Sequence, residues 1–498
     1  MYFCSLKSVK KPKLKYSVNK PLCPPVYAAI IPLALLLLSL VVCLVTLGAD
    51  PILSISPWLL IGAGLAALTV SRLTTRRSPR HLLSGLRKSA RQVIPAYPIL
   101  LLIGTLSAAW MVSGVVPLMI DYGVRLLYPP AFLPLACMIC AVISVVTGSS
   151  WTTIATIGVA FMGIGSVLGY PAPWVAGAII SGAYFGDKVS PLSDTTVLAS
   201  STVGVDLFTH IRNMMITTVP AISLALIVFA VVGYLTPAQS SADINEVTAA
   251  IRSTFNLTPW LLIVPALTCI MIALKVKTLI TLSVATLSGI LAAIFFQPHC
   301  FAQIADGAST ISAAAMILFK GASLSTGNEL LDPLLQTSGM MGMMSTVWLI
   351  TAAMFFGGMM IGTGILSSIT QAFISRLRRP IALIASTVGG GLFLNTATGD
   401  QYISLIIGGN IFNSAYRRAA IEPKMLSRTL EDSVSVTSVL IPWNSCGMTQ
   451  STVLGISTIA YAPCCIFNIL SPVMSLVIAA IGSRIHSRFA LRAQTHQS

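Results

Sequence analysis

The chain of 498 residues is 55% hydrophobic and only 9% charged, with a net charge of +16 and a mean hydropathy of +0.87. Apolar runs of about 20 residues, the length that a membrane-spanning helix needs, recur along the whole chain. These features predict an all-α polytopic membrane protein. They exclude a soluble globular fold and a membrane β-barrel, whose strands alternate over segments of about 10 residues.

The positive charges lie mainly in short stretches between apolar runs, which is the pattern of cytoplasmic loops in membrane proteins. The stretch 71–92 carries seven Lys and Arg residues and no acid, and it predicts such a loop. Aromatic residues do not alternate with the basic ones, as a binder of single-stranded nucleic acid would require. We therefore expect the lipid bilayer as a partner, and no nucleic acid.

In chain order the sequence divides into five parts. They are a basic cytoplasmic N-terminus (1–25), a first membrane half (26–235), a polar outer linker (236–258), a second membrane half (259–483) and a cytoplasmic tail (484–498). The apolar run 26–48 exceeds the core of a signal peptide, which has about 7–15 residues, so we expect it to be a retained span. Both termini then lie in the cytoplasm, with about 10–12 transmembrane segments of roughly 20 residues each.

The stretch 182–214 (GAYFGDKVSPLSDTTVLASSTVGVDLFTHIRNM) combines charges with helix-breaking residues. It contains Asp187, Asp194 and Asp206 among several Gly residues and a Pro. An ionisable side chain inside the bilayer costs about 2.5–3.5 kcal/mol. Broken backbone is tolerated there only where protein or a water-filled cavity satisfies it. This combination predicts a transport site.

The two halves share motifs in the same order. TGSSWTTIATIG (147–158) aligns without gaps with TGDQYISLIIGG (398–409), and DKVS (187–190) aligns with DSVS (432–435). The offsets, 398 − 147 = 251 and 432 − 187 = 245 residues, are close to half the chain. Secondary transporters are often built from inverted-topology repeats with broken helices at matching positions. We therefore expect two inverted-topology repeats that contain discontinuous helices or re-entrant hairpins.

The acidic residues around these motifs are the candidate cation ligands. Carboxylates, hydroxyl groups such as that of Thr153, and carbonyl groups freed by a broken helix supply oxygen ligands for Na⁺. We expect Asp187, Asp194 and Asp432 to bind Na⁺, and we favour a functional role for Asp400. A carboxylate that binds either Na⁺ or H⁺ couples the two fluxes by competition.

Several of these candidate residues also have a purely structural interpretation. Asp187 could pair with Lys188, and Asp194 and Asp206 could cap helices, with capping favoured for Asp206. Thr153 could hydrogen-bond back to its own helix. The sequence contains neither HExxH nor GxSxG, so we do not expect an enzyme. No cofactor is expected beyond the transported Na⁺ and H⁺.

The strings at 182–214 and 431–447 (EDSVSVTSVLIPWNSCG) resemble the NhaC-type Na⁺/H⁺ antiporter family, and the resemblance covers most of 90–480. It implies alternating-access exchange of Na⁺ for H⁺ across a bacterial plasma (inner) membrane, in the service of pH homeostasis. By this resemblance, the first broken helix contains Asp187, Ser190, Ser193, Asp194 and Thr195. The counterparts in the second half are Asp432, Thr437, Pro442, Trp443 and Asn444.

The same family includes carriers that resemble malate/lactate and amino-acid exchangers. A second hypothesis is therefore a Na⁺/H⁺-coupled exchanger of a small organic anion or amino acid. In that case Arg212, Lys188 or the N-terminus of a half-helix could hold a substrate carboxylate. A channel fits paired half-helices less well than an alternating-access carrier does. An organic substrate and a homodimer are left open as partners.

Overall fold

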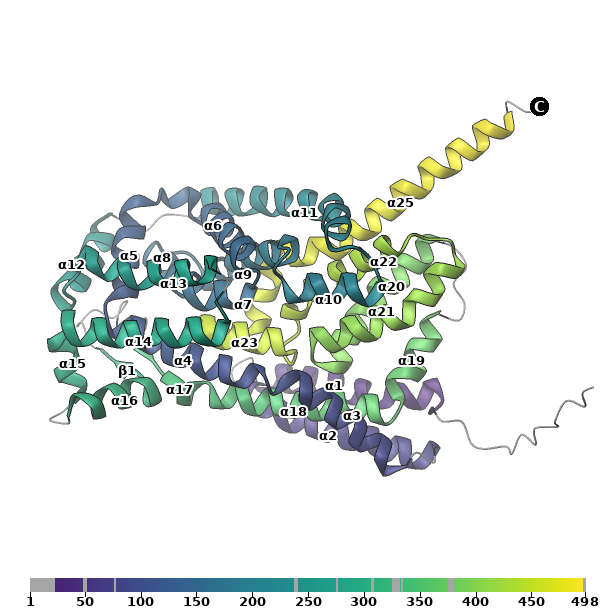
Figure 1. The fold of residues 1–498 in the computed structure, drawn as a ribbon, viewed down its shortest axis with the longest axis horizontal. Coiled ribbons are helices and arrows are strands. Elements are labelled where there is room, and N and C mark those ends of the chain that lie inside the picture. The colour runs from purple at the N-terminus through teal and green to yellow at the C-terminus, as the bar shows by residue number, and fades with distance from the viewer. Residues whose placement is uncertain are drawn as a thin grey trace, which may run out of the picture.

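The computed structural model of the chain describes residues 23–47, 52–75, 78–236, 241–274, 276–305, 309–324, 332, 335–374 and 380–495. These residues form a bundle of α-helices, and the all-α class is confirmed (Figure 1). The one sheet among them is a short antiparallel pair, β1 (Ala322–Ser323) and β2 (Gln336–Thr337), in which Ala322 is opposite Thr337. Most of the expected basic N-terminus, residues 1–22, lies outside the described residues.

Helices follow one another along the described chain. Up to residue 235 they are α1 (Val26–Leu47), α2 (Ile52–Thr74), α3 (Pro79–Val93), α4 (Ala96–Val112), α5 (Val115–Leu126), η1 (Pro129–Ala131), α6 (Phe132–Thr147), α7 (Ser150–Thr153), the π-helix η2 (Ile154–Gly158), α8 (Val159–Val167), α9 (Ala172–Val189), α10 (Asp194–Val203) and α11 (Leu207–Leu235). From residue 241 to 374 they are α12 (Ser241–Thr254), η3 (Pro259–Leu262), α13 (Ile263–Ala273), α14 (Thr278–Phe296), α15 (Pro298–Ala305), α16 (Thr310–Lys320), α17 (Gly339–Gly342), α18 (Met344–Gly362) and α19 (Ile365–Ile374). The remaining helices are α20 (Pro380–Thr398), α21 (Gln401–Arg418), α22 (Pro423–Leu430), the π-helix η4 (Glu431–Ser435), η5 (Ser438–Leu440), α23 (Ser445–Leu454), α24 (Thr458–Tyr461), η6 (Ala462–Cys464) and α25 (Ile466–Thr495).

Nine helices among the described residues are long and apolar enough to cross a membrane, or up to eleven if each of two bent helix pairs is one span. The polytopic membrane class is therefore confirmed, and the number of candidate spans is close to the expected number.

The stretch 71–92, expected to be a loop, is mostly the helix α3. Its Leu82 and Leu86, four residues apart, place an apolar stripe against α18, which is the spacing of one helix face. The linker 236–258 likewise contains the helix α12.

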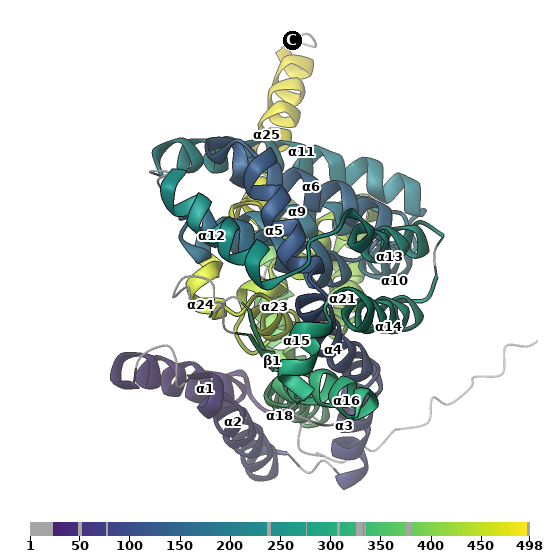
Figure 2. The same ribbon diagram turned by 90° about the vertical axis from the view of Figure 1, so that its left-hand side faces the viewer.

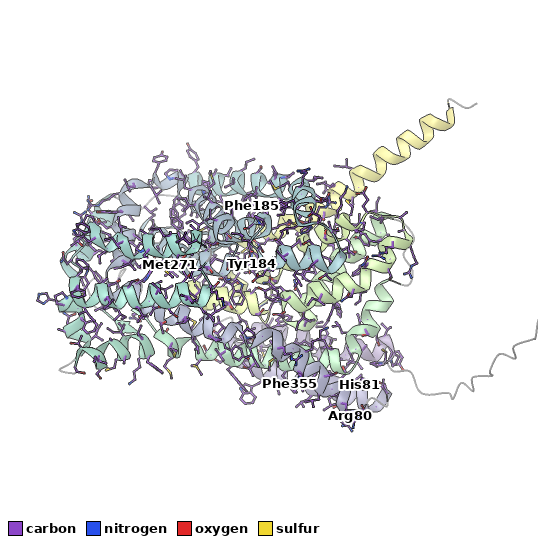
Figure 3. The ribbon with its side chains drawn as sticks, in the orientation of Figure 1. Arg80, His81, Tyr184, Phe185, Met271 and Phe355 are labelled. Atoms are coloured by element: carbon purple, nitrogen blue, oxygen red, sulfur yellow. The ribbon has the colours of Figure 1, made fainter. Side chains whose placement is uncertain are left out.

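The arrangement places α9 in the middle of the bundle. Figures 1 and 2 show α1, α2, α3 and α18 together on one side of the molecule and α11 on the opposite side. The C-terminal part of α25 extends beyond the bundle. Tyr184 and Phe185 of α9 lie near the centre, whereas Arg80 and His81 of α3 lie at an edge (Figure 3). The motif at the end of α9 is thus carried by the central helix.

Glycine residues allow α9 to approach α6 very closely. A Cβ atom on Gly182 would lie 2.0 Å from the carbonyl oxygen of Cys137, and one on Gly186 would lie 2.3 Å from that of Ala141. Small residues at helix interfaces of membrane proteins permit such contact between backbones. The close packing positions the C-terminal end of α9, and with it Asp187, relative to α6.

The DKVS and DSVS motifs both lie at helix breaks. After α9 the chain is non-helical from Ser190 to Ser193 before α10 begins. After the π-helix η4 the chain runs through residues 436–444, which include the short η5, before α23 begins. The expected discontinuous helices are therefore present in both halves. Their inverted orientation stays a prediction.

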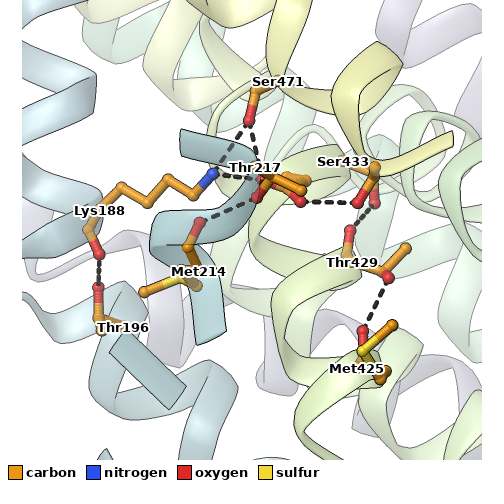
Figure 4. A network of polar contacts seen from close by, with 10 residues as sticks. Lys188, Thr196, Met214, Thr217, Met425, Thr429, Ser433 and Ser471 are labelled. Atoms are coloured by element: carbon orange, nitrogen blue, oxygen red, sulfur yellow. Dashed lines mark hydrogen bonds and ion pairs between the residues drawn. The ribbon is translucent and has the colours of Figure 1, made fainter. Parts of the chain in front are cut away.

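A buried ion pair connects the two motifs. Lys188 of α9 and Asp432 of η4 form a salt bridge, with side chains 1% and 0% exposed. Asp432 also accepts hydrogen bonds from Ser471 at 2.9 Å and Ser475 at 2.6 Å on α25, and from Thr217 on α11 at 3.2 Å. Figure 4 shows Lys188, Thr217 and Ser471 around this network. Four elements from both halves therefore meet at one carboxylate.

We predict that Gly182→Ala destabilises the protein by about 1–3 kcal/mol, the usual cost of overpacking. The matched control is Gly389→Ala in α20, where a Cβ atom would have no neighbour within 4 Å. Replacing a helical Gly by Ala without a clash stabilises by about 0.5–1 kcal/mol. Thermal unfolding of the detergent-solubilised variants measures both effects. Equal melting temperatures for the two variants would contradict the tight α9–α6 contact.

We expect Asp432→Asn to lower the free energy of unfolding by about 3–5 kcal/mol, because it leaves the buried charge of Lys188 unpaired. Asp206→Asn is the control, since Asp206 is exposed and Asn caps a helix as well as Asp. The double variant Lys188→Met/Asp432→Asn removes both charges and should recover part of the loss. Thermal unfolding of all four variants, including Lys188→Met alone, is the measurement. Strict additivity of the two single effects would refute a direct pair.

Candidate cation site

The two aligned Thr-Gly motifs form the same turn. Gly148 and Gly399 follow the ends of α6 and α20 with φ values of 66° and 67°, in the left-handed region that glycine adopts readily. The next residue caps the following helix in each case. Ser149 accepts a hydrogen bond from the N–H of residue 152 at 3.2 Å, and Asp400 accepts one from the N–H of residue 403 at 2.9 Å. The sequence alignment therefore corresponds to a shared local geometry.

Threonine hydroxyl groups hold both turns. Thr147 Oγ1 accepts from the backbone N–H of the capping residue at 3.2 Å and hydrogen-bonds with Thr153 at 3.3 Å. Thr398 Oγ1 accepts from the N–H of Asp400 at 3.2 Å and hydrogen-bonds with Ser404 at 2.8 Å. Thr153 also donates to the carbonyl oxygen one turn earlier, at 3.0 Å. The hydroxyl of Thr153 is thus engaged within its own turn.

Asp187 joins the broken helix to the first of these turns. Its Oδ2 accepts hydrogen bonds from the N–H of Ser150 at 3.1 Å and from the hydroxyl of Ser150 at 2.7 Å. The side chain is half-buried. It does not pair with Lys188, which is bound to Asp432. Asp187 is therefore held at the N-terminus of the helical run that begins with α7, where N–H groups favour negative charge.

The serines of the SPLSD segment support the break. Ser190 donates to a carbonyl oxygen of α6 at 2.7 Å. Ser193, and not Asp194, is the N-cap of α10, accepting from the N–H of Thr196 at 3.4 Å, and it hydrogen-bonds with Thr195 at 3.0 Å. Asp194 is the first residue of α10 and is exposed. The capping interpretation of Asp194 is therefore wrong, and Asp194 instead lines the cavity at the break.

A cavity of about 540 Å³ lies at this break. Its lining contains Asp187, Asp194 and Thr195 of the first half and Gln401 and Tyr402 of the second half. No Lys, Arg or His is among its lining residues. The cavity therefore carries two carboxylates without a cationic side chain to balance them.

The other candidates of the second half are not among the residues that line this cavity. Asp432 is paired with Lys188, and Asp400 caps α21 and accepts from the hydroxyl of residue 445 at 3.2 Å. Thr437 accepts from the amide of residue 395 at 3.2 Å, and Asn444 caps α23. In the part of the chain that the structure describes, no three His, Cys, Asp or Glu side chains are grouped to hold a metal ion. The structure thus brings Asp187 and Asp194 together and leaves Asp432 apart from them.

Some residues of the site were not among the sequence candidates. Gln401 and Tyr402 align with Ser150 and Trp151 of the first motif, so the alignment could have identified them.

The exposed Asp206 accepts from the N–H of residue 209 at 2.9 Å as the N-cap of α11. This hydrogen bond lowers the pKa of Asp206, and the favoured capping interpretation is confirmed.

Residues 182–483 match the Na⁺/H⁺ antiporter family. The chain is 38% identical over 384 residues to the Na⁺/H⁺ antiporter NhaC of Alkalihalophilus pseudofirmus, covering 77% of this chain and 81% of the relative. It is 36% identical to the malate-2H⁺/Na⁺-lactate antiporter of Bacillus subtilis, over 74% and 77% of the two chains. It is 32% identical to the arginine/ornithine antiporter ArcD of Halobacterium salinarum, over 92% and 93%. The chain therefore belongs to the Na⁺/H⁺ antiporter family, and it is a multi-pass membrane transporter.

Proposed function

We propose that this protein exchanges Na⁺ for H⁺ across the membrane and that the cation binds in the cavity beside Asp187. The observation that carries the proposal is the lining of this cavity, which has two carboxylates and no cationic side chain. Asp187 is half-buried, and an unbalanced negative charge that is partly removed from water is costly. A monovalent cation or a proton relieves that cost, and the family of the chain agrees with both ions.

The ligands for a small cation are available around Asp187. The carboxylates of Asp187 and Asp194 and the hydroxyl groups of Thr152 and Thr195 belong to one lining. Hard cations take oxygen ligands of this kind. The non-helical chain from Ser190 to Ser193 adds backbone groups outside a regular helix, as in other carriers with broken helices.

Competition between Na⁺ and H⁺ couples the fluxes of the two ions. When Na⁺ and H⁺ both relieve the excess negative charge of one site, the binding of one favours the release of the other, and neither needs a separate gate. Alternating access then exposes the site to one side of the membrane at a time. The break after α9 and the break after η4, tied by Lys188 and Asp432, are the elements on which such a motion would act.

The exchange of an organic anion or amino acid is the second candidate. The cavity volume of about 540 Å³ is within the range of small-molecule sites, and two of the relatives above are exchangers of organic substrates. However, Lys188 is already paired and Arg212 is exposed, and neither lines the cavity. A substrate carboxylate would meet Asp187 and Asp194 without a cationic partner, so we favour the inorganic cation.

We predict that Asp187→Asn lowers Na⁺-dependent proton exchange to about a tenth of wild type or less. The reason is that a loss of about 1.4 kcal/mol in the free energy of cation binding already lowers the affinity tenfold. Everted vesicles with a fluorescent pH-gradient probe measure the exchange on addition of Na⁺. Asp206→Asn is the matched control, the same change at an exposed cap outside the cavity, and it should retain wild-type exchange. Membrane insertion should be equal in both. Wild-type exchange in Asp187→Asn would remove this residue from the site.

Wild-type vesicles distinguish the two candidate functions. Under Na⁺/H⁺ exchange, Na⁺ alone should collapse a preformed pH gradient, since no other substrate is needed. Under the alternative, the gradient should persist until malate, lactate or an amino acid is added together with Na⁺. Vesicles from the same host without the protein provide the baseline.

A further inference from the structure

Glu431 is a buried carboxylate that the site described above does not use. It is the first residue of the π-helix η4 and is 0% exposed, and neither of its carboxylate oxygens has a hydrogen-bond partner. Asp187, Asp400 and Asp432 each accept at least one hydrogen bond. Among the buried carboxylates in the described part of the chain, Glu431 alone is left without a donor. Because buried polar groups are nearly always hydrogen-bonded, this exception needs a chemical reason.

The surroundings of Glu431 suit a neutral acid. Ser435, one turn further along η4, interacts with Glu431, but its Oγ is also buried without a partner in hydrogen-bonding geometry. Burying an ionised carboxylate without donors costs far more than burying the neutral carboxylic acid. Glu431 is therefore placed where gaining or losing a proton has a large energetic consequence.

Three charged side chains interact electrostatically with Glu431. Lys188 attracts its negative charge, while Asp187 and Asp432 repel it. Lys188 is already paired with Asp432, so Asp187 is the neighbour whose charge depends on a bound cation. The elements packed on η4 carry these further titratable groups among their described side chains: Asp194 on α10, Tyr402, Tyr416, Arg417 and Arg418 on α21, and Lys424 and Arg428 on α22, with none on α20 or α25.

We infer that Glu431 carries the exchanged proton while the cation occupies the site at Asp187. This inference rests on the proposed Na⁺/H⁺ exchange and assigns its two ions to different carboxylates. A cation at Asp187 offsets the repulsion between the two carboxylates, so Glu431 releases its proton to water on the side to which the site opens. When the cation leaves, the repulsion returns and Glu431 takes up a proton from the other side. One O–H bond is broken and re-formed in each cycle, and no electrons are transferred.

The test separates cation movement from proton coupling in proteoliposomes of the full-length protein. Exchange of radioactive Na⁺ against internal Na⁺ reports the cation site, and an internal pH dye reports Na⁺-driven proton movement. In Glu431→Gln the carboxamide cannot release a proton. Proton movement should fall about tenfold or more, while Na⁺/Na⁺ exchange stays within about twofold, a change of about 0.4 kcal/mol. Glu422→Gln, the same change at the exposed N-cap of α22, should leave both fluxes unchanged.

The outcomes are distinguishable. A wild-type protein that moves no protons on addition of Na⁺ would refute the proposed function itself. Wild-type proton movement in Glu431→Gln would overturn the inference and leave the function intact. Loss of both fluxes would place Glu431 in the cation site and also overturn the inference. If Glu431→Gln does not insert, Glu431→Asp decides, because a proton carrier moved by one methylene must shift the pH of half-maximal exchange, and an unchanged pH profile contradicts the assignment.

Discussion

The buried salt bridge between Lys188 and Asp432 is the contact on which the rest of the site depends. It joins residues 244 positions apart, and each charge would be costly to bury without the other. Neighbouring residues of an α-helix point about 100° apart. When Lys188 is directed to Asp432, Asp187 is turned toward Ser150 and the cavity. One ion pair thus orients a second carboxylate that it does not touch.

The two Thr-Gly turns show how a repeat can keep its geometry while its chemistry diverges. A glycine in the left-handed region and a capping side chain are enough to end one helix and begin the next. Ser149 and Asp400 both satisfy that requirement. The following position differs, because Ser150 binds Asp187 whereas Gln401 accepts from the hydroxyl of Ser438 at 3.3 Å. The halves therefore share a backbone device, and only the first half uses it to hold an acid of the cavity.

The sequence predicted what depends on local chemistry. The membrane class and the helix breaks at the DKVS and DSVS motifs follow from hydropathy, Gly and Pro placement, and rare charges. It could not predict which acid would meet which base, since Lys188 adjoins Asp187 in sequence and pairs with Asp432 only in the folded protein. Stretch 71–92 was misjudged because its many basic residues obscured the apolar stripe of α3. Glu431 adjoins the DSVS motif, but the sequence could not distinguish it from the neighbouring acids, since its lack of donors exists only after packing.

Under the proposed function, the need to neutralise charge in the site explains why it favours exchange over simple release. Lys188 and Asp432 neutralise each other, and their charges are not available to an entering ion. The negative charge that remains near the break belongs to Asp187, Asp194 and Glu431. The more deeply one of these charges is buried, the more it costs to leave it unbalanced. A state in which the cation has left is therefore accessible at low cost only if a proton has arrived. In the proposed exchange, the coupling of the two ions then follows from the cost of the empty site, and no mechanical link between them is needed.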